Sequence, residues 1–413
     1  METLTTPDFA KTLVPDSGQA WLRLAATMLA STVGGVGMWS VVVALPAVQT
    51  EFGVPRAEAS LPFTLAMLGF ALGGVVMGRL FDRAGILAPL AVGAAALSAG
   101  YLVAASAGSL SVFALAHAVF GLGTSVTFGP LMADISHWFV RRRGVAVTLC
   151  SSGNYIAGTV WPPIVQQAIA LYGWRAAHAG IGLTCGAAML LIGLVALRQK
   201  APAALLNASA ATRSAAPANL GLSPAALQTL LALASVCCCV AMSMPQVHII
   251  AYCGDLGYGV ARGADMLALM MAFGIAGRII SGFVADRIGG LLTLMLGSAL
   301  QSVALLLYLL YDGLISLYVI SAVFGLFQGG IVPSYAIIVR EYFPAKEAGA
   351  HIGMILMASL FGMALGGWMS GYIFDLTGSY RAAFFNGLAW NAVNGSIVLW
   401  LLFRRHRSRI AYA

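Results

Sequence analysis

Twelve long apolar segments constrain the fold of this 413-residue chain more than any other feature. A helix needs about 20 mostly apolar residues to cross the hydrocarbon core of a bilayer. Lipid offers no partner to an unpaired backbone N–H or C=O, so each segment is expected to be a helix. We place the segments at approximately 22–48, 60–80, 86–106, 110–134, 144–171, 175–197, 225–252, 264–285, 291–311, 314–339, 349–374 and 381–403. The sequence therefore predicts an all-α polytopic membrane protein with twelve transmembrane helices.

The composition excludes the main classes of soluble protein. Hydrophobic residues make up 60% of the chain and charged residues only 9%, whereas about 25% of an ordinary soluble domain is charged. Soluble enzymes and nucleic-acid-binding proteins are therefore not expected. The six cysteines lie in apolar stretches without C-x-x-C spacing, so we expect no metal site and no cofactor.

The distribution of basic residues predicts the orientation in the membrane. Seventeen of the 22 Lys and Arg residues fall on the side that holds both termini, four fall on the other side, and Arg278 lies inside a helix. Because basic loops stay in the cytoplasm, both termini are expected there, in a multi-pass protein of the plasma (inner) membrane. The net charge of +8 then needs no nucleic-acid partner. The Ala- and Gly-rich, short-looped chain is typical of bacterial proteins.

A polar stretch divides the apolar segments into two sets of six. Residues 198–224 contain several Pro, Ser, Asn and basic residues and few large apolar ones, which is typical of a linker. The predicted organisation is a cytoplasmic tail at 1–21, a six-helix bundle at 22–197, a cytoplasmic linker at 198–224, a second six-helix bundle at 225–403 and a basic cytoplasmic tail at 404–413.

The two halves repeat each other at an offset of 204 residues. The segment Ala118–Leu122 (AVFGL) recurs at Ala322–Leu326, and Asp82-Arg83 recurs as Asp286-Arg287. Parallel repeats of six helices place a substrate site near the bilayer midplane between the halves. The repeat therefore favours alternating access over a pore.

Several motifs resemble those of a known superfamily of transporters. The segment Gly78–Gly85 (GRLFDRAG) and its copy Gly282–Gly289 (GFVADRIG) resemble the loop 2–3 signature of the major facilitator superfamily. Within it, Met244–His248, Gly277–Gly282 and Phe374–Tyr380 are similar to monocarboxylate transporters and to related oxalate/formate-type carriers. The resemblance covers essentially the whole chain. It implies secondary active transport of small carboxylates.

Arg278 is the sharpest single candidate for a binding residue. It lies near the middle of a predicted helix, and none of the 14 acidic residues lies near the middle of any predicted helix. A buried Arg in a membrane costs about 2.5–3.5 kcal/mol on insertion scales, so something must compensate. A substrate carboxylate suits the planar guanidinium fork. The alternative is an Arg bonded to helix carbonyls or reaching the cytoplasmic rim. The resemblance implies the first role, because the matching Arg of monocarboxylate transporters binds the substrate carboxylate.

The residues that carry protons in the resembling family are missing here. Many family members have an Asp one turn before this Arg, where this chain has Gly274, and the first predicted helix lacks the Lys of animal members. His248 is the candidate proton site, and His117 is expected to be a packing residue. His248 could instead be a hydrogen-bonded helix residue, and the substrate acid could itself carry the proton.

The rest of the substrate site is inferred by position. Related carriers place an aromatic residue at Phe128 and, in oxalate exchangers, a Lys at Ser359, so a single fixed positive charge favours a monocarboxylate here. Helix packing is the alternative role for every lining candidate. The lining candidates are Met38, Trp39, Phe128, Asn154, Tyr155, Val332, Tyr335 and Ser359. A small, mostly apolar pocket with one cationic end would suit a short hydroxy, keto or branched acid.

Charged residues near helix ends on the cytoplasmic side are expected to form ion pairs between the halves when the inside is closed. They are Arg79, Asp82, Arg83, Asp134, Asp286 and Arg287. They are not expected to bind substrate.

The sequence thus predicts a monomeric secondary transporter of small monocarboxylates in a lipid bilayer, with proton symport. An organic-anion exchanger or uniporter without proton coupling is the alternative. A drug-efflux pump is disfavoured because no membrane-embedded acid is present, and a sensor because no extra domain is. A membrane enzyme is disfavoured because the chain lacks H-E-x-x-H and G-x-S-x-G stretches.

Overall fold

The computed structural model describes residues 15–199, 220–344 and 347–411. Most of the predicted N-terminal tail and linker, and the last two residues of the predicted C-terminal tail, lie outside the described residues. Within the described ranges every regular element is helical, and none is a strand.

The first half of the chain forms helices α1 to α7. Their bounds are α1 Gly18–Gly34, α2 Val36–Phe52, α3 Arg56–Ala84, α4 Leu87–Ala105, α5 Leu110–Thr124, a 3₁₀ turn η1 Ser125–Thr127, α6 Gly129–Ser136 and α7 Arg143–Ala196. The long α7 reverses direction at Gly173, whose φ of 78° and ψ of 159° are not helical. Only glycine adopts this backbone conformation without strain, so one continuous assignment contains two membrane spans.

The second half forms helices α9 to α15. Their bounds are α9 Pro224–Asp255, α10 Val260–Ile288, α11 Gly290–Leu310, α12 Leu314–Gln328, α13 Ile331–Tyr342, α14 Ala348–Thr377 and α15 Tyr380–Ala411. The last glycine of each repeated signature ends a helix. Gly85 ends α3 with φ 77° and Gly289 ends α10 with φ 83°.

The predicted membrane-spanning fold is confirmed. Ten helical stretches of the described chain are long and apolar enough to cross a membrane. The turn in α7 makes one of them a pair of spans, and α15 completes the twelve. Large apolar side chains such as Ile315, 80% exposed, point outward because lipid rather than water surrounds them.

The repeat also governs how helices pack. In each half a glycine lies directly against the backbone of a neighbouring helix. A Cβ at Gly121 of α5 would collide with the carbonyl oxygen of Ala66 in α3, and one at Gly325 of α12 would collide with that of Met270 in α10. Gly121 and Gly325 are 204 residues apart in sequence, and so are their partners Ala66 and Met270. Small residues allow membrane helices this close approach, where van der Waals packing replaces the hydrophobic driving force.

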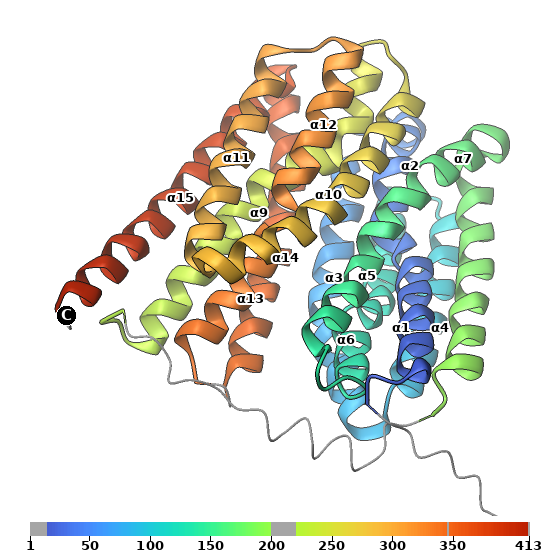
Figure 1. Ribbon diagram of the computed structural model, residues 1–413. Coiled ribbons are helices and arrows are strands. Elements are labelled where there is room, and N and C mark those ends of the chain that lie inside the picture. The colour runs from blue at the N-terminus through green and yellow to red at the C-terminus, as the bar shows by residue number, and fades with distance from the viewer. Residues whose placement is uncertain (1–14, 200–219, 345–346, 412–413) are drawn as a thin grey trace, which may run out of the picture.

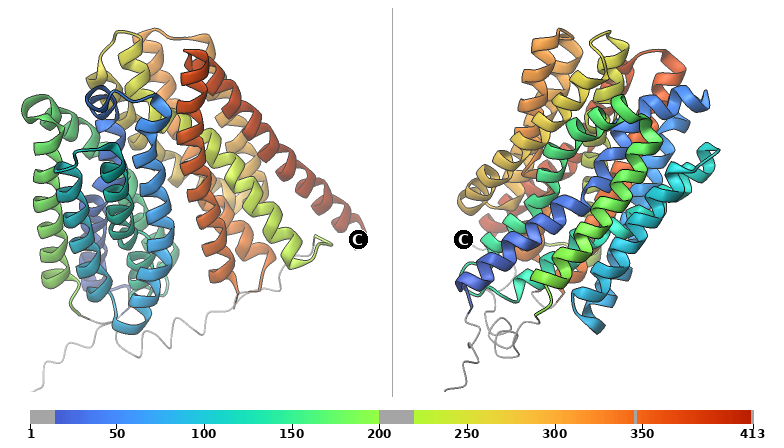
Figure 2. Two further views of the ribbon diagram at one scale, coloured as in Figure 1. Left: turned by 180° about the vertical axis from the view of Figure 1, so that it is seen from behind. Right: turned by 90° about the vertical axis from the view of Figure 1, so that its right-hand side faces the viewer.

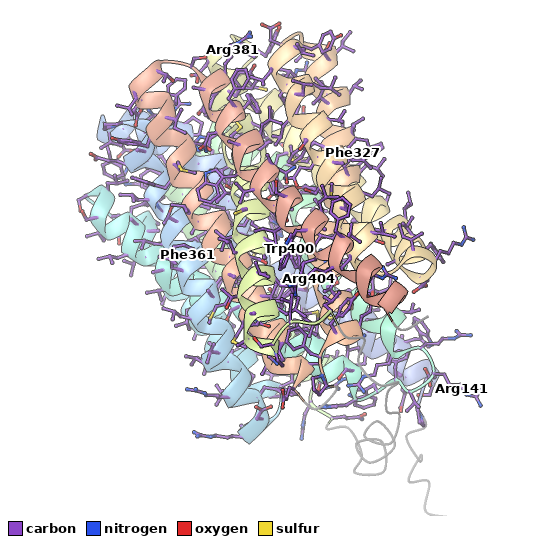
Figure 3. The ribbon with its side chains drawn as sticks, turned by 90° about the vertical axis from the view of Figure 1, so that its left-hand side faces the viewer. Arg141, Phe327, Phe361, Arg381, Trp400 and Arg404 are labelled. Carbon is purple, nitrogen blue, oxygen red and sulfur yellow. The ribbon has the colours of Figure 1, made fainter. Side chains whose placement is uncertain are left out.

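The helices are arranged as two groups side by side, α1 to α7 and α9 to α15 (Figure 1). We call the end at which α1 begins and α3 and α10 finish the near end, and the opposite one the far end. The groups lie together toward the far end and diverge toward the near end, as both Figure 1 and the left view of Figure 2 show. Figure 3 shows Arg381 at the far end, Arg141 at the near end, and the aromatic Phe327 and Phe361 between these levels.

Candidate functional site

Arg278 of α10 is a buried cation that lacks an acidic partner among the described residues. Only 6% of the surface of Arg278 is exposed. Nη1 donates to the hydroxyl oxygen of Ser151 at 2.8 Å and to the carbonyl oxygen of Ser151 at 3.3 Å, across the boundary between the two groups of helices. The buried Nε finds no hydrogen-bond acceptor within the described chain. One serine thus solvates a full positive charge whose remaining donors are free for an anion.

An aromatic ring covers the guanidinium. The guanidinium carbon lies 4.4 Å from the centroid of the Tyr155 ring, a distance at which the ring face attracts a cation. The same ring fills the space beside Gly274, where an added Cβ would lie 2.7 Å from Cδ1 of Tyr155. At this position the ring therefore occupies the space of the Asp that the resembling family carries.

Three further lining candidates join this cluster from α2 and α7. The indole N–H of Trp39 donates to the backbone carbonyl of Asn154 at 3.2 Å, and the Asn154 amide N–H donates to the sulfur of Met38 at 3.2 Å. Oδ1 of Asn154 is buried, and it has no donor among the residues described. The structure therefore brings together one set of residues, which we call the central cluster: Met38, Trp39, Ser151, Asn154, Tyr155 and Arg278.

The other lining candidates make their described contacts outside the central cluster. The Tyr335 hydroxyl donates to Oδ1 of Asn394 at 3.2 Å, and the Ser359 hydroxyl donates to the carbonyl of Ile355 at 3.0 Å. Both hydroxyls thus bond within the C-terminal helices, while Val332 is partly buried against the same core. Phe128 is half-buried at the break between η1 and α6, with its ring 6.4 Å from that of Phe70.

The near end holds the charged residues that we expected to pair between the halves. Five of them are exposed, and the described part of the chain shows no ion pair to any of them: Arg79, Asp82, Arg83, Asp286 and Arg287. Asp134 is different, because its carboxylate is buried and binds Arg23 of α1 at 2.8 and 2.9 Å. That pair lies inside the N-terminal group of helices.

At the far end, Arg56 joins the two groups of helices. As the first residue of α3, it donates through both terminal nitrogens to the Asp255 carboxylate at 3.0 and 3.2 Å and to the Tyr380 hydroxyl at 2.6 Å. The backbone N–H groups of Arg56 and Ala57 donate to the Asp375 carboxylate at 2.8 and 2.7 Å. An acid that accepts from the first N–H groups of a helix is a favourable cap. These bonds tie α3 to α9, α14 and α15.

His248 connects to this network through Tyr380. Nε2 lies 2.8 Å from the carbonyl oxygen of Gly367, which can only accept, so Nε2 carries the proton. Nδ1 lies 3.0 Å from the Tyr380 hydroxyl, the position from which a neutral imidazole accepts a hydrogen bond. The histidine is fully buried.

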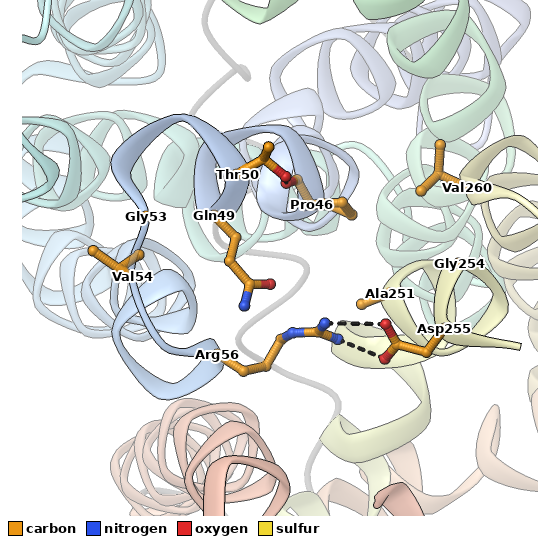
Figure 4. Close-up of a pocket in the computed structure, with 10 residues that line it drawn as sticks. All are labelled: Pro46, Gln49, Thr50, Gly53, Val54, Arg56, Ala251, Gly254, Asp255 and Val260. Atoms are coloured by element: carbon orange, nitrogen blue, oxygen red, sulfur yellow. Dashed lines mark hydrogen bonds and ion pairs between the residues drawn. The ribbon is translucent and has the colours of Figure 1, made fainter. Parts of the chain in front are cut away.

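A pocket of about 410 Å³ adjoins the Arg56–Asp255 pair (Figure 4). Its wall combines the end of α2, the loop that follows it and the start of α3 with the facing ends of α9 and α10. Polar side chains on this wall come from Gln49, Thr50, Arg56 and Asp255. Figure 4 shows the Gln49 side chain extending toward Arg56.

Reasoning from the sequence missed Ser151, Arg56 and Asp255 as site residues. Arg56 is one of the four basic residues that the charge distribution places on the side away from the termini, and its partner Asp255 is 199 residues away. The segment Phe374–Tyr380, quoted for its resemblance, does contain Asp375 and Tyr380. For Ser151 and Asp255 the sequence offers no signal.

Comparisons with known proteins agree with this architecture. The family model described as Major Facilitator Superfamily matches residues 27–320 and 266–411. Monocarboxylate transporter 13 of Bos taurus is 26% identical, over 90% of this chain and 86% of its own. Monocarboxylate transporter 11 of Homo sapiens is 27% identical, over 93% and 82%.

Two solved structures share the fold. A crystal structure of a mutant of the nucleoside transporter NupG has a TM-score of 0.72 at 13% identity, covering 93% of this chain and 99% of that one. A bacterial homologue of the human lysosomal transporter Spinster, inward-facing and occupied, has a TM-score of 0.67 at 15% identity, covering 94% and 96%.

Proposed function

Because the chain belongs to the Major Facilitator Superfamily, we propose that it is a secondary transporter of small monocarboxylates in which Arg278 anchors the carboxylate. The superfamily and its curated relatives are transporters, so the chain is a multi-pass membrane transporter and not an enzyme. The monocarboxylate transporters among those relatives support the carboxylate class of substrate.

The observation that carries the proposal is the unneutralised charge of Arg278. Burying a cation without a counter-ion is costly, and one serine replaces only part of its hydration. A substrate carboxylate would supply the missing charge and accept from the free N–H donors. The apolar surfaces of Met38, Trp39 and Tyr155 would suit a short carbon chain. The unpartnered Oδ1 of Asn154 would accept from the hydroxyl of a hydroxy acid.

Alternating access would move the two groups of helices against each other. The far end is held by the Arg56 network, while the charged residues of the near end are exposed and unpaired in the described chain. This supports a state that is open at the near end, which we assign to the cytoplasm from the distribution of basic residues. Arg79, Asp82, Arg83, Asp286 and Arg287 would pair when that end closes.

Proton coupling through His248 is the finer part of the proposal. A proton on Nδ1 would stop it from accepting the Tyr380 hydroxyl hydrogen, and it would add a second cation to the hydroxyl that already accepts from Arg56. Protonation would thereby loosen the far end. An exchanger or uniporter without protons is the alternative, and it is supported by the absence of a carboxylate from the central cluster.

Ligand-induced thermal stabilisation of the purified protein tests the substrate class. A ligand that binds only the folded state raises its stability by RT ln(1 + [L]/Kd). We expect L-lactate and pyruvate to raise Tm, and lactamide, which has the same shape without the charge, to leave it unchanged. Arg278→Gln should greatly reduce the shift, while Arg262→Gln, an exposed cation of the far end, should preserve it. Equal shifts from lactate and lactamide would contradict the proposal.

A further inference from the structure

Arg56 already holds a carboxylate, and a pocket lies beside that contact. The guanidinium binds both oxygens of Asp255, in the bidentate geometry by which Arg recognises carboxylates (Figure 4). The bound carboxylate belongs to the protein itself. Asp255 is thus an internal example of the chemical group that this guanidinium accepts.

The two partners are held very differently. The Arg56 side chain is 10% exposed and that of Asp255 is 37% exposed. The Arg56 guanidinium is also covered by the Phe374 ring, 4.6 Å away, and Nη1, one of the two nitrogens that bind Asp255, donates to the Tyr380 hydroxyl as well. Asp255 is the last residue of α9. Its carboxylate already contacts solvent, so hydrating it fully after the ion pair to Arg56 breaks would cost little free energy. The cation is therefore fixed, and the carboxylate is the exchangeable member.

The pocket can hold a small acid at this cation. Its volume of about 410 Å³ lies within the roughly 300–1,000 Å³ usual for ligand sites. The two terminal nitrogens of Arg56 that bind Asp255 are the donors that a ligand carboxylate would use. Gln49 and Thr50 add polar groups to the wall, and Val54, Ala251 and Val260 add apolar surface.

We propose that Arg56, with Gln49, forms a second carboxylate-binding site at the far end, in which an arriving small monocarboxylate takes the place of Asp255. The exchange replaces one Arg–carboxylate pair by another, so it breaks the bond between α3 and α9 at little net cost. Substrate that arrives at the far end would then break the Arg56–Asp255 contact that keeps this end closed to it. The ligand class rests on the proposed function, but the site is separate from Arg278.

The test uses a reporter thiol in the pocket. All six native cysteines are buried, whereas Thr50 is exposed on the pocket wall, so Thr50→Cys provides one reactive thiol. The measurement is the rate at which a negatively charged methanethiosulfonate reagent modifies it in the purified full-length protein, as L-lactate is added. The protein without the reporter cysteine gives the background, and lactamide is the uncharged control.

We expect lactate, but not lactamide, to slow the reaction. Arg56→Gln should raise the half-protecting lactate concentration by roughly tenfold or more, as for loss of a bidentate charged pair. Arg56→Lys should fall between Gln and the native residue. Asp255→Asn should lower that concentration several-fold, because it removes the competing charge, and Arg262→Gln should not change it.

The Arg278→Gln background separates this inference from the proposed function. Lactate should still protect Thr50→Cys there, even though binding at the central cluster is lost. Protection that disappears with Arg278→Gln would overturn the second site, as would equal half-protecting concentrations in the native, Arg56→Gln and Asp255→Asn backgrounds. Absence of lactate protection in all backgrounds would overturn it as well.

Discussion

Arg278 could be found from sequence because a charge inside an apolar run is conspicuous and costly. Its neighbours could not be found in the same way. Ser151, which accepts from the guanidinium, looks like many other serines of small-residue helices, and it is 127 residues away in sequence. Tyr155 was proposed as a lining residue, but its role as a cover over the cation depends on the absence of a side chain at Gly274. A functional residue can thus be predicted from sequence where its burial in the membrane carries a large free-energy cost.

Replacing Tyr155 tests whether its ring orients the guanidinium. Tyr155→Leu removes a cation–π contact of about 1–2 kcal/mol for a desolvated pair, and Arg278 must then be ordered by the substrate itself. We expect the Kd for L-lactate to rise roughly tenfold in Tyr155→Leu, and to stay within about twofold in Tyr155→Phe, which keeps the ring. Calorimetric titration of the purified variants provides both values, and equal losses in Leu and Phe would show that the hydroxyl matters instead.

The helices were predictable to within a few residues because lipid demands long apolar runs, and their number is confirmed. Their interruptions were not predicted. The predicted helix at 22–48 is divided into α1 and α2 at Gly35, and that at 110–134 is interrupted by η1. These breaks depend on close backbone contacts between helices, which apolar periodicity does not report. The repeated glycines were noticed in sequence only as part of a five-residue match.

The glycine contacts between helices are expected to be sensitive to a single methyl group. In Gly325→Ala the new Cβ would collide with the carbonyl oxygen of Met270 and force α10 and α12 apart. Overpacking of this kind typically costs about 1–3 kcal/mol. We expect a clear drop in the Tm of the detergent-solubilised protein, measured by scanning fluorimetry.

Gly282→Ala is the matched control, because a Cβ there has open space within 4 Å. Its Tm should be unchanged or slightly higher, since Ala is favoured over Gly by about 1 kcal/mol in a helix interior. A larger loss in Gly282→Ala than in Gly325→Ala would refute this account of how α10 and α12 pack.

At the scale of the whole molecule, the two ends behave oppositely. Arg56, Asp255, Asp375 and Tyr380 connect the halves at the far end, over separations of 199 to 324 residues. Residues so distant in sequence cannot be paired without the structure, and in the sequence Arg56 is only one of four basic residues on the side away from the termini. Sequence reasoning did identify charged residues of the near end as a group, although the structure places Asp134 in a pair with Arg23 instead.

Removing a charged side chain from the near end should therefore lower the transport rate more than the affinity for substrate. We expect Asp82→Asn to slow L-lactate transport several-fold, because an ion pair of the closed near end would be lost. Its lactate Kd should stay within about twofold of the native value, since Asp82 is exposed and makes no contact with the central cluster among the described interactions. Transport rates in proteoliposomes and Kd values from titration, measured on the same variant, separate the effect on transport rate from the effect on affinity. A loss of affinity as large as that of Arg278→Gln would place Asp82 in the binding site.

The central claim is that Arg278 anchors the carboxylate of a substrate moved by alternating access with protons. Uptake of labelled L-lactate into proteoliposomes, with and without an inward proton gradient, tests it most directly, with Arg278→Gln and Arg262→Gln measured in parallel. We expect the proton gradient to stimulate uptake by the native protein. The Arg262→Gln variant should retain this uptake, and the Arg278→Gln variant should lose it. Gradient-stimulated uptake that persists in Arg278→Gln would contradict the claim.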